Sequence, residues 1–374
     1  MLVKPPILLT PTPIKHRNYL QSKHAFGALC RSPIISKAVA LIGPTNAGKS
    51  TILYQCYIQA LADFAAANKW LEPVIGMRMA TSQDARVSQR YLLLQLLKAL
   101  RHPTYEHVGE LDELEHYLPQ GSRNETSMRI AAERALVSRC TSQSYLDEAQ
   151  HLTHTGNLEF QDRLFQSIKT LLAVDRALFL AGGYELAYNG MFNCAHFSGR
   201  LIVVEYPPYR EVEDDIMEFV GVLRAWEQLV PVQKELLVKN AIPLLRAHNG
   251  IVGSAEAHVF DCKVRAEASG ALIDETLLYA CMPTRAAQEK IAQDIEQGQE
   301  ALRRCGKDIQ LVSQPSGEGA TTSNAGRKSK LPSAESTDQH IQKNRKKKHK
   351  PFVRAPKRRA TGVEHIKVRG RDRK

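Results

Sequence analysis

Consecutive residues near the N-terminus carry the types and spacing that phosphate binding requires: Gly43, Pro44, Thr45, Asn46, Ala47, Gly48, Lys49 and Ser50, followed by Thr51. Glycines let the backbone curl so that its N–H groups point at a β-phosphate. Lys49 can reach the β- and γ-phosphates, and the Ser50 hydroxyl can ligate Mg²⁺. This Walker A pattern lies between an apolar run, 38–42, and a helix-forming segment, which argues against an ordinary Gly-rich turn. The sequence therefore predicts a site for ATP and Mg²⁺.

An acidic pair, Asp147-Glu148, follows a second strand candidate and could complete this site. Beside the Walker strand, Asp147 would hold the Mg²⁺ shell and Glu148 would accept a proton from the attacking water. Acidic dipeptides also cap helices, and the preceding residues 141–144 are more polar than a buried central strand usually is. We expect the pair to lie on the strand next to the Walker strand.

Strands and helices alternate through a little over half of the chain, up to residue 209. The predicted strands are 38–42, 74–80, 142–146, 176–181 and 201–206, and the predicted helices between them are 51–69, 83–100, 125–138 and 158–173. This alternation predicts a parallel sheet covered by helices on both faces. After Tyr209 the pattern is helical only, over 211–229, 233–247, 254–268 and 274–280, which predicts a small helical domain.

Composition limits the class of protein. The chain has 374 residues, 43% of them hydrophobic, and no apolar stretch long enough to cross a bilayer. The N-terminus has no signal-peptide pattern, and the seven cysteines form no Cys-x-x-Cys pair. We expect a soluble, cytoplasmic protein with reduced cysteines and no membrane association.

The positive charge is concentrated at the C-terminus. Residues 343–374 hold 15 Lys or Arg against two acidic residues, whereas the remainder has a net charge of −1. The preceding segment is rich in Ser, Gly and Thr, a composition that favours a flexible linker. The tail is predicted to be a disordered basic arm that attracts nucleic acid phosphates or an acidic partner protein; a solubilising tail is the alternative.

Several segments resemble the AAA+ ATPases of DNA transposition, TnsC and TniB. The resemblance covers about residues 39–300 and rests on the Walker loop, the stretch Asp-Glu-Ala-Gln-His-Leu (147–152), Ser-Gly-Arg (198–200) before a strand that ends in Tyr-Pro-Pro-Tyr (206–209), and Gly-Ile-Val-Gly (250–253) at the start of a helix. It implies a P-loop AAA+ domain followed by a helical lid. The resulting domains are a short N-terminal extension (1–38), the AAA+ domain (39–209), the lid (210–305), the linker (306–342) and the basic tail (343–374).

The resemblance also implies a function: an ATPase that assembles as a homo-oligomeric ring or filament on double-stranded DNA and activates a transposase. Its implied partners are a TnsB-like transposase and a TniQ-like target-selection protein, and its location is nucleoid-associated. Arg200 then resembles an arginine finger that reaches the neighbouring subunit's ATP, rather than an ordinary surface arginine. Gln83, Arg86 and Arg90 would face the DNA backbone, with a solvated helix face as the alternative.

Two departures from the AAA+ pattern predict slow hydrolysis. The segment 181–183 has no polar side chain where a sensor would orient the attacking water, and Gly253 stands where many lids carry a sensor arginine.

His151 and His154 could suggest a metal site, but the carboxylates beside them are already assigned to Mg²⁺ chemistry. A helicase-loader or replication-initiation ATPase and a non-catalytic nucleotide switch are the alternative functions.

Overall fold

The computed structural model describes residues 2, 14–64, 71–79, 87–105, 124–154, 158–172, 175–191 and 195–305. Met1–Pro315 forms one compact unit. The predicted linker (306–342) and basic tail (343–374) lie outside the described residues, which end at residue 305. Within the described ranges, no helix is long and apolar enough to span a bilayer.

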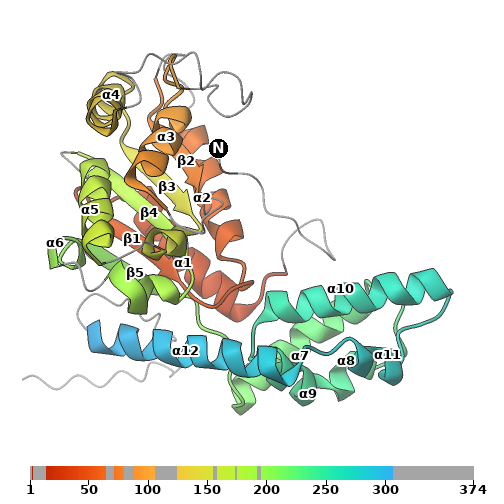
Figure 1. The fold of residues 1–374 in the computed structure, drawn as a ribbon. Coiled ribbons are helices and arrows are strands. Elements are labelled where there is room, and N and C mark those ends of the chain that lie inside the picture. Colours follow the sequence, from red (N-terminus) through yellow and green to blue (C-terminus); the bar gives the residue numbers. More distant parts are fainter. Residues whose placement is uncertain are drawn as a thin grey trace, which may run out of the picture. The chain divides into compact units, whose positions relative to one another are not determined.

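A five-stranded parallel sheet forms the centre of the α/β part (Figure 1). Its strands are β1 (Ala38–Ile42), β2 (Val74–Arg78), β3 (Gln143–Asp147), β4 (Ala177–Gly182) and β5 (Leu201–Glu205), in the order β2-β3-β4-β1-β5. All ladders between neighbouring strands are parallel, as the alternation of strands and helices predicted. One expectation was wrong: β3 does not pair with β1, because β4 lies between them.

Helices cover both faces of the sheet, so the central strands β1 and β4 are apolar throughout. Along β1, Val39 and Leu41 face the core beneath α1 (Arg17–Arg31) and α2 (Lys49–Phe64). Ala38, Ala40 and Ile42 face the opposite core. That second core lies beneath α3 (Gln89–Ala99), α4 (Glu125–Ser138) and α5 (Leu158–Ile168). This alternation follows from the two-residue period of a strand.

The polar start of β3 can be buried because the Gln143 side chain is hydrogen-bonded within the strand. All five residues of β3 are buried. The Tyr145 hydroxyl donates to the Gln143 side-chain oxygen at 2.9 Å, and the Tyr145 ring stacks on Phe179 of β4 at a centroid distance of 4.8 Å. Strand β3 thus enters the core although its sequence lacks the usual run of Val, Ile and Leu.

A helical part follows β5. Its elements are α7 (Glu213–Glu227), α8 (Leu236–Lys239), α9 (Ala241–Ala247), α10 (Val252–Ser269) and α11 (Glu275–Ala280), and they share a core around Trp226. The single helix expected over 233–247 is two short helices, α8 and α9, which meet at Asn240.

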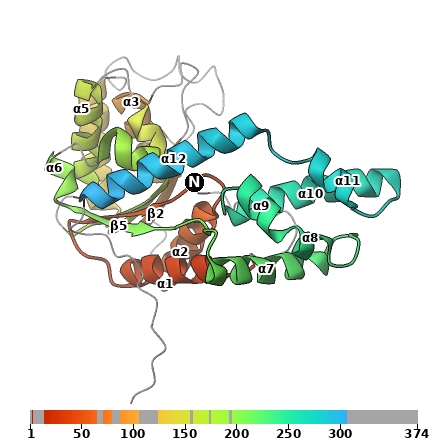
Figure 2. The same ribbon diagram turned by 90° about the horizontal axis from the view of Figure 1, so that it is seen from below.

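Helix α12 (Arg285–Cys305) returns from the helical part to the α/β part, as Figure 2 shows. Leu302 is buried in the core beneath α5, and the Tyr188 hydroxyl donates to Asp294 at 2.8 Å. Gly298 lies against Tyr184, where a Cβ atom would come within 2.2 Å of the ring. Neither α12 nor α1 was predicted as a helix from the sequence, and both connect the two parts of the molecule.

Candidate nucleotide site

The Walker loop bridges the end of β1 and the start of α2, as its sequence predicted. Its backbone needs glycine at two positions. A Cβ atom at Gly43 would lie 2.4 Å from the Tyr206 carbonyl oxygen, and Gly48 has φ +100°. Asn46 also has positive φ, at 63°. The loop lines a cavity of about 410 Å³, which is large enough for a small-molecule ligand.

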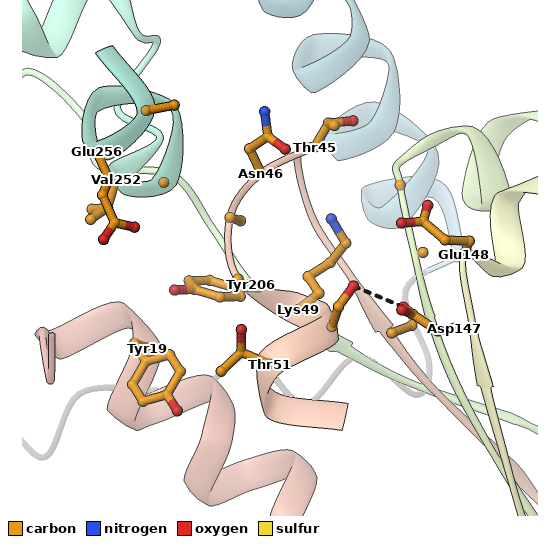
Figure 3. Close-up of a pocket in the computed structure, with 18 of the residues that line it drawn as sticks. Tyr19, Thr45, Asn46, Lys49, Thr51, Asp147, Glu148, Tyr206, Val252 and Glu256 are labelled. Atoms are coloured by element: carbon orange, nitrogen blue, oxygen red, sulfur yellow. Dashed lines mark hydrogen bonds between the residues drawn. The ribbon is translucent and has the colours of Figure 1, made fainter. Parts of the chain in front are cut away.

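Lys49 lies at the bottom of this cavity and is buried. Its Nζ donates to the Pro44 carbonyl oxygen at 2.6 Å. Burial lowers the pKa of Lys49 to about 8, and the nearby carboxylates of Glu148 and Asp147 oppose that shift. Lys49 and Glu148 both line the cavity (Figure 3). A polyanion bound beside Lys49 would raise this pKa.

Ser50 and Asp147, the two residues expected to ligate Mg²⁺, are in hydrogen-bond contact. The Ser50 hydroxyl donates to Asp147 Oδ1 at 2.9 Å, although the two residues come from β-α units separated by β4. Burial raises the pKa of Asp147, and the hydrogen bond from Ser50 opposes this shift. A hydroxyl beside a carboxylate fits Mg²⁺, which prefers oxygen ligands and keeps several waters.

Glu148 stands next to this pair and projects into the cavity. Its backbone is left-handed, with φ 54°, which is uncommon for a residue other than glycine. Both carboxylate oxygens accept hydrogen bonds: Oε1 from Arg78 at 3.4 Å and Oε2 from Gln150 at 2.5 Å. A carboxylate held in this way at the cavity wall suits a general base. The sequence analysis identified Glu148 but missed its two partners.

The histidines after Glu148 are not grouped as metal ligands. His151 Nδ1 lies 3.4 Å from His154 Nδ1, and His154 pairs with Glu185 at 3.1 Å. Across the described ranges, no three His, Cys, Asp or Glu side chains are placed to hold a metal ion.

Another part of the cavity wall is formed by the N-terminal segment and by the lid. Ile14, His16 and Tyr19 line one part of it, and Val252 and Glu256 of α10 line another (Figure 3). These apolar and aromatic side chains could bind a base and a ribose. No local sequence signal marks the N-terminal residues, which were taken for a short extension.

His16 connects this wall to the start of the lid. Its Nδ1 lies 3.0 Å from the Tyr209 hydroxyl, and its Nε2 lies 3.2 Å from the Tyr206 hydroxyl. Burial, with a smaller contribution from Arg17, lowers the pKa of His16 to about 4. A neutral imidazole offers one donor and one acceptor, and both tyrosines can match it. His16 is therefore a neutral link between the cavity and the lid.

Arg200 lies at the other edge of the sheet. It directly precedes β5, and its carbonyl oxygen accepts from the Ala38 amide at 2.8 Å, at the amino-terminal end of the strands. The Walker loop follows the carboxyl end of β1, so roughly 16 Å of strand separates the two levels. Arg200 is absent from the lining of its own cavity.

The other expected residues have different outcomes. Arg90 is exposed on α3, whereas Gln83 and Arg86 lie outside the described residues. Gly253 is the second residue of α10, and a Cβ atom there would lie 2.0 Å from the Asn46 carbonyl oxygen. The lid backbone at Gly253 therefore contacts the Walker loop. Gly253 is the residue that stands in the sequence where a sensor arginine would be expected.

Strand order, Walker loop and lid now combine. The Walker loop follows β1, the acidic pair follows β3 with β4 between, and a helical domain contacts the loop. The fold is of the P-loop AAA+ type.

Comparisons with known proteins concern this fold. No protein-family profile matches the chain. No curated protein matches it significantly in sequence. Among solved structures, the ORC2 protein of Aeropyrum pernix in its ADP form is 14% identical, over 73% of this chain and 69% of that one, with a TM-score of 0.48. The Walker-type ATPase PABY2304 of Pyrococcus abyssi is also 14% identical, over 80% of each chain, with a TM-score of 0.41.

Proposed function

We propose that this protein hydrolyses ATP between neighbouring copies of itself and thereby controls its assembly on double-stranded DNA. One observation carries the proposal. The cavity of one copy brings together the Walker loop, the Ser50–Asp147 pair and Glu148, while Arg200 lies at the opposite edge of the sheet. An arginine in that position can serve a second copy's cavity but not its own.

Each side chain then has a role. The loop N–H groups and Lys49 bind the β- and γ-phosphates, and Ser50 and Asp147 would hold Mg²⁺, which would neutralise charge on the phosphate oxygens. Glu148 accepts the proton of the attacking water. The partner copy's arginine stabilises the charge that develops on the γ-phosphate. Hydrolysis would be slow and would act as a clock for disassembly.

The biological setting that we propose is DNA transposition. It rests on the sequence resemblance to TnsC and TniB, above all on the stretch 147–152 and the strand end 206–209. In this setting the ATP-bound oligomer marks a duplex target, and a TnsB-like transposase and a TniQ-like selection protein bind to it. The protein would then be associated with the nucleoid.

Electron microscopy of negatively stained protein tests the assembly. The full chain is mixed with linear duplex DNA, or with single-stranded DNA of equal length, with or without a non-hydrolysable ATP analogue. We expect filaments or stacked rings only on the duplex and only with the analogue, and none for Lys49→Ala. Rings on single strands would favour a helicase loader instead. Dispersed particles in every sample would refute assembly on DNA.

A second measurement tests the basic tail. Deleting 343–374 removes a net charge of +13 and should weaken DNA or transposase binding, flatten its salt dependence and leave ATP affinity unchanged. Equal binding by the shortened and full chains at low and high salt would show that the tail has no such role.

A further inference from the structure

The end of β4 has an unusual arrangement beside Glu148. The strand ends in Ala181 and Gly182 and continues into Gly183, so no polar side chain is available there. Instead, Gln150 reaches this place from the turn after β3. Its Oε1 accepts the Gly183 N–H at 3.1 Å, and its Nε2 donates to Glu148.

Gly182 and Gly183 leave room for the side chain of Gln150. A Cβ atom at Gly182 would lie 3.1 Å from the backbone nitrogen of Gln150 and 3.1 Å from its Oε1. At Gly183 a Cβ atom would contact the Gln150 side chain at 3.9 Å. A larger residue at Gly182 would thus displace the amide. The glutamine occupies space that a side chain at the end of β4 would otherwise fill.

Hydrogen bonding fixes the orientation of the amide. The Gly183 N–H can only donate, so it must face the amide oxygen. The ionised Glu148 carboxylate can only accept, so it must face the amide nitrogen. The turn itself is held as well, because the Thr153 hydroxyl donates to the Gln150 carbonyl oxygen at 2.7 Å. Gln150 is therefore a fixed connection between β4 and the carboxylate.

Arg78 is less suited to this task. Its side chain is 60% exposed, and its nitrogen lies 3.4 Å from Glu148. A long exposed side chain loses more conformational freedom when it is held in one position. The carboxylate has lone pairs to spare, so the bond from Gln150 leaves it able to accept a hydrogen bond from water.

We infer that Gln150 is a positioning residue for hydrolysis, which aims Glu148 at the attacking water and replaces the polar group that the end of β4 lacks. This inference rests on the proposed ATPase activity. Loss of the amide leaves the nucleotide-binding residues in place and disorders the base.

Kinetics of the full-length protein with duplex DNA test this inference. For Gln150→Ala we expect kcat to fall roughly 10- to 100-fold, because misplacement of a reacting group by about 1 Å costs up to that much. The affinity for a fluorescent ATP analogue should change less than twofold. Gln161→Ala is the matched control: Gln161 is a glutamine too, but it is buried and donates to the Asn189 carbonyl oxygen away from the cavity. Its kcat should equal that of the wild type.

A further variant separates positioning from mere stability. In the double variant Gln150→Ala with Gly183→Asn, an amide returns from β4, where the contacts leave room for a Cβ atom. We expect it to recover part of kcat.

The outcomes are distinguishable. If the wild type hydrolyses ATP and Gln150→Ala has an unchanged kcat, the inference on Gln150 is wrong and the ATPase proposal stands. If Gln150→Ala loses nucleotide affinity together with kcat, or the double variant recovers none of kcat, a structural role replaces the positioning role. If the wild type hydrolyses no ATP with or without DNA, the proposed function and this inference are both refuted.

Discussion

Replacing Gly253 with alanine should separate the lid from the Walker loop. A Cβ atom at Gly253 would lie 2.0 Å from the Asn46 carbonyl oxygen and 3.1 Å from the Asn46 carbonyl carbon. Carbon and oxygen atoms that touch without bonding are about 3.3 Å apart or more. The two backbones must therefore move apart by more than about 1 Å. Both line the nucleotide cavity, so either movement changes the site.

The size of the effect follows from the cost of overpacking. Forcing an extra methyl group into a well-packed place costs about 1–3 kcal/mol, and every 1.4 kcal/mol is a factor of ten in affinity. We expect ATP to bind Gly253→Ala roughly 5- to 150-fold more weakly. The higher helix propensity of alanine, worth up to about 1 kcal/mol, limits any loss in the free energy of unfolding.

Equilibrium titration with a fluorescent ATP analogue measures this affinity, and Gly221→Ala is the matched control. Gly221 lies on α7, and a Cβ atom there meets nothing within 4 Å. This control should raise the melting temperature and leave the affinity unchanged, because alanine gains helix propensity in open space. If both variants bind ATP as tightly as the wild type, contact between the lid and the Walker loop does not shape the site.

Three further predictions concern charge and pH. Arg200→Ala should lower hydrolysis at least about 10³-fold without affecting nucleotide affinity, and mixing with Lys49→Ala subunits should restore part of the rate; no restoration would argue against a shared site. Because the pKa of Lys49 is about 8 and phosphate raises it, ATP binding at pH 8.5 should take up a proton. Equal calorimetric enthalpies in buffers of different ionisation enthalpy would contradict this. The pKa of His16 lies near 4, below its usual 6.5, so the unfolded chain binds this proton first as pH falls. The free energy of unfolding should drop by up to about 3 kcal/mol between pH 6.5 and 4, and less in His16→Asn, as urea titrations would show.

Much of the α/β part could be predicted because its signals are local. The bounds of β1, β2 and β4 agree with the apolar runs to within one or two residues, and α4 agrees at both ends. The broken helix over 233–247 was missed, since the left-handed residue Glu235 (φ 60°) and the bend at Asn240 have no strong sequence signal. Helix α1 was missed because prolines before it made the N-terminus resemble an irregular extension.

The sequence alone determined the Walker loop and the acidic pair proposed to act with it. A Walker loop depends on glycine conformations and on Lys49 and Ser50 at fixed steps along one short segment, so the pattern is complete in the local sequence. Asp147 and Glu148 follow one another in the same way. Their identity needed no knowledge of the strand order: the expected neighbouring strand was wrong, and yet Ser50 and Asp147 are in hydrogen-bond contact in the structure.

Only the tertiary structure decided what surrounds these residues. Gln150 is hydrogen-bonded to Gly183, which is 33 residues away in the sequence, and His16 is hydrogen-bonded to Tyr209, which is 193 residues away. Contacts over such separations depend on which strands lie side by side and on where the lid meets the loop, and no periodicity or local motif encodes them. In the sequence, the end of β4 lacks a polar side chain that could orient water. In the fold, the absence of that side chain leaves the space that Gln150 occupies beside Glu148.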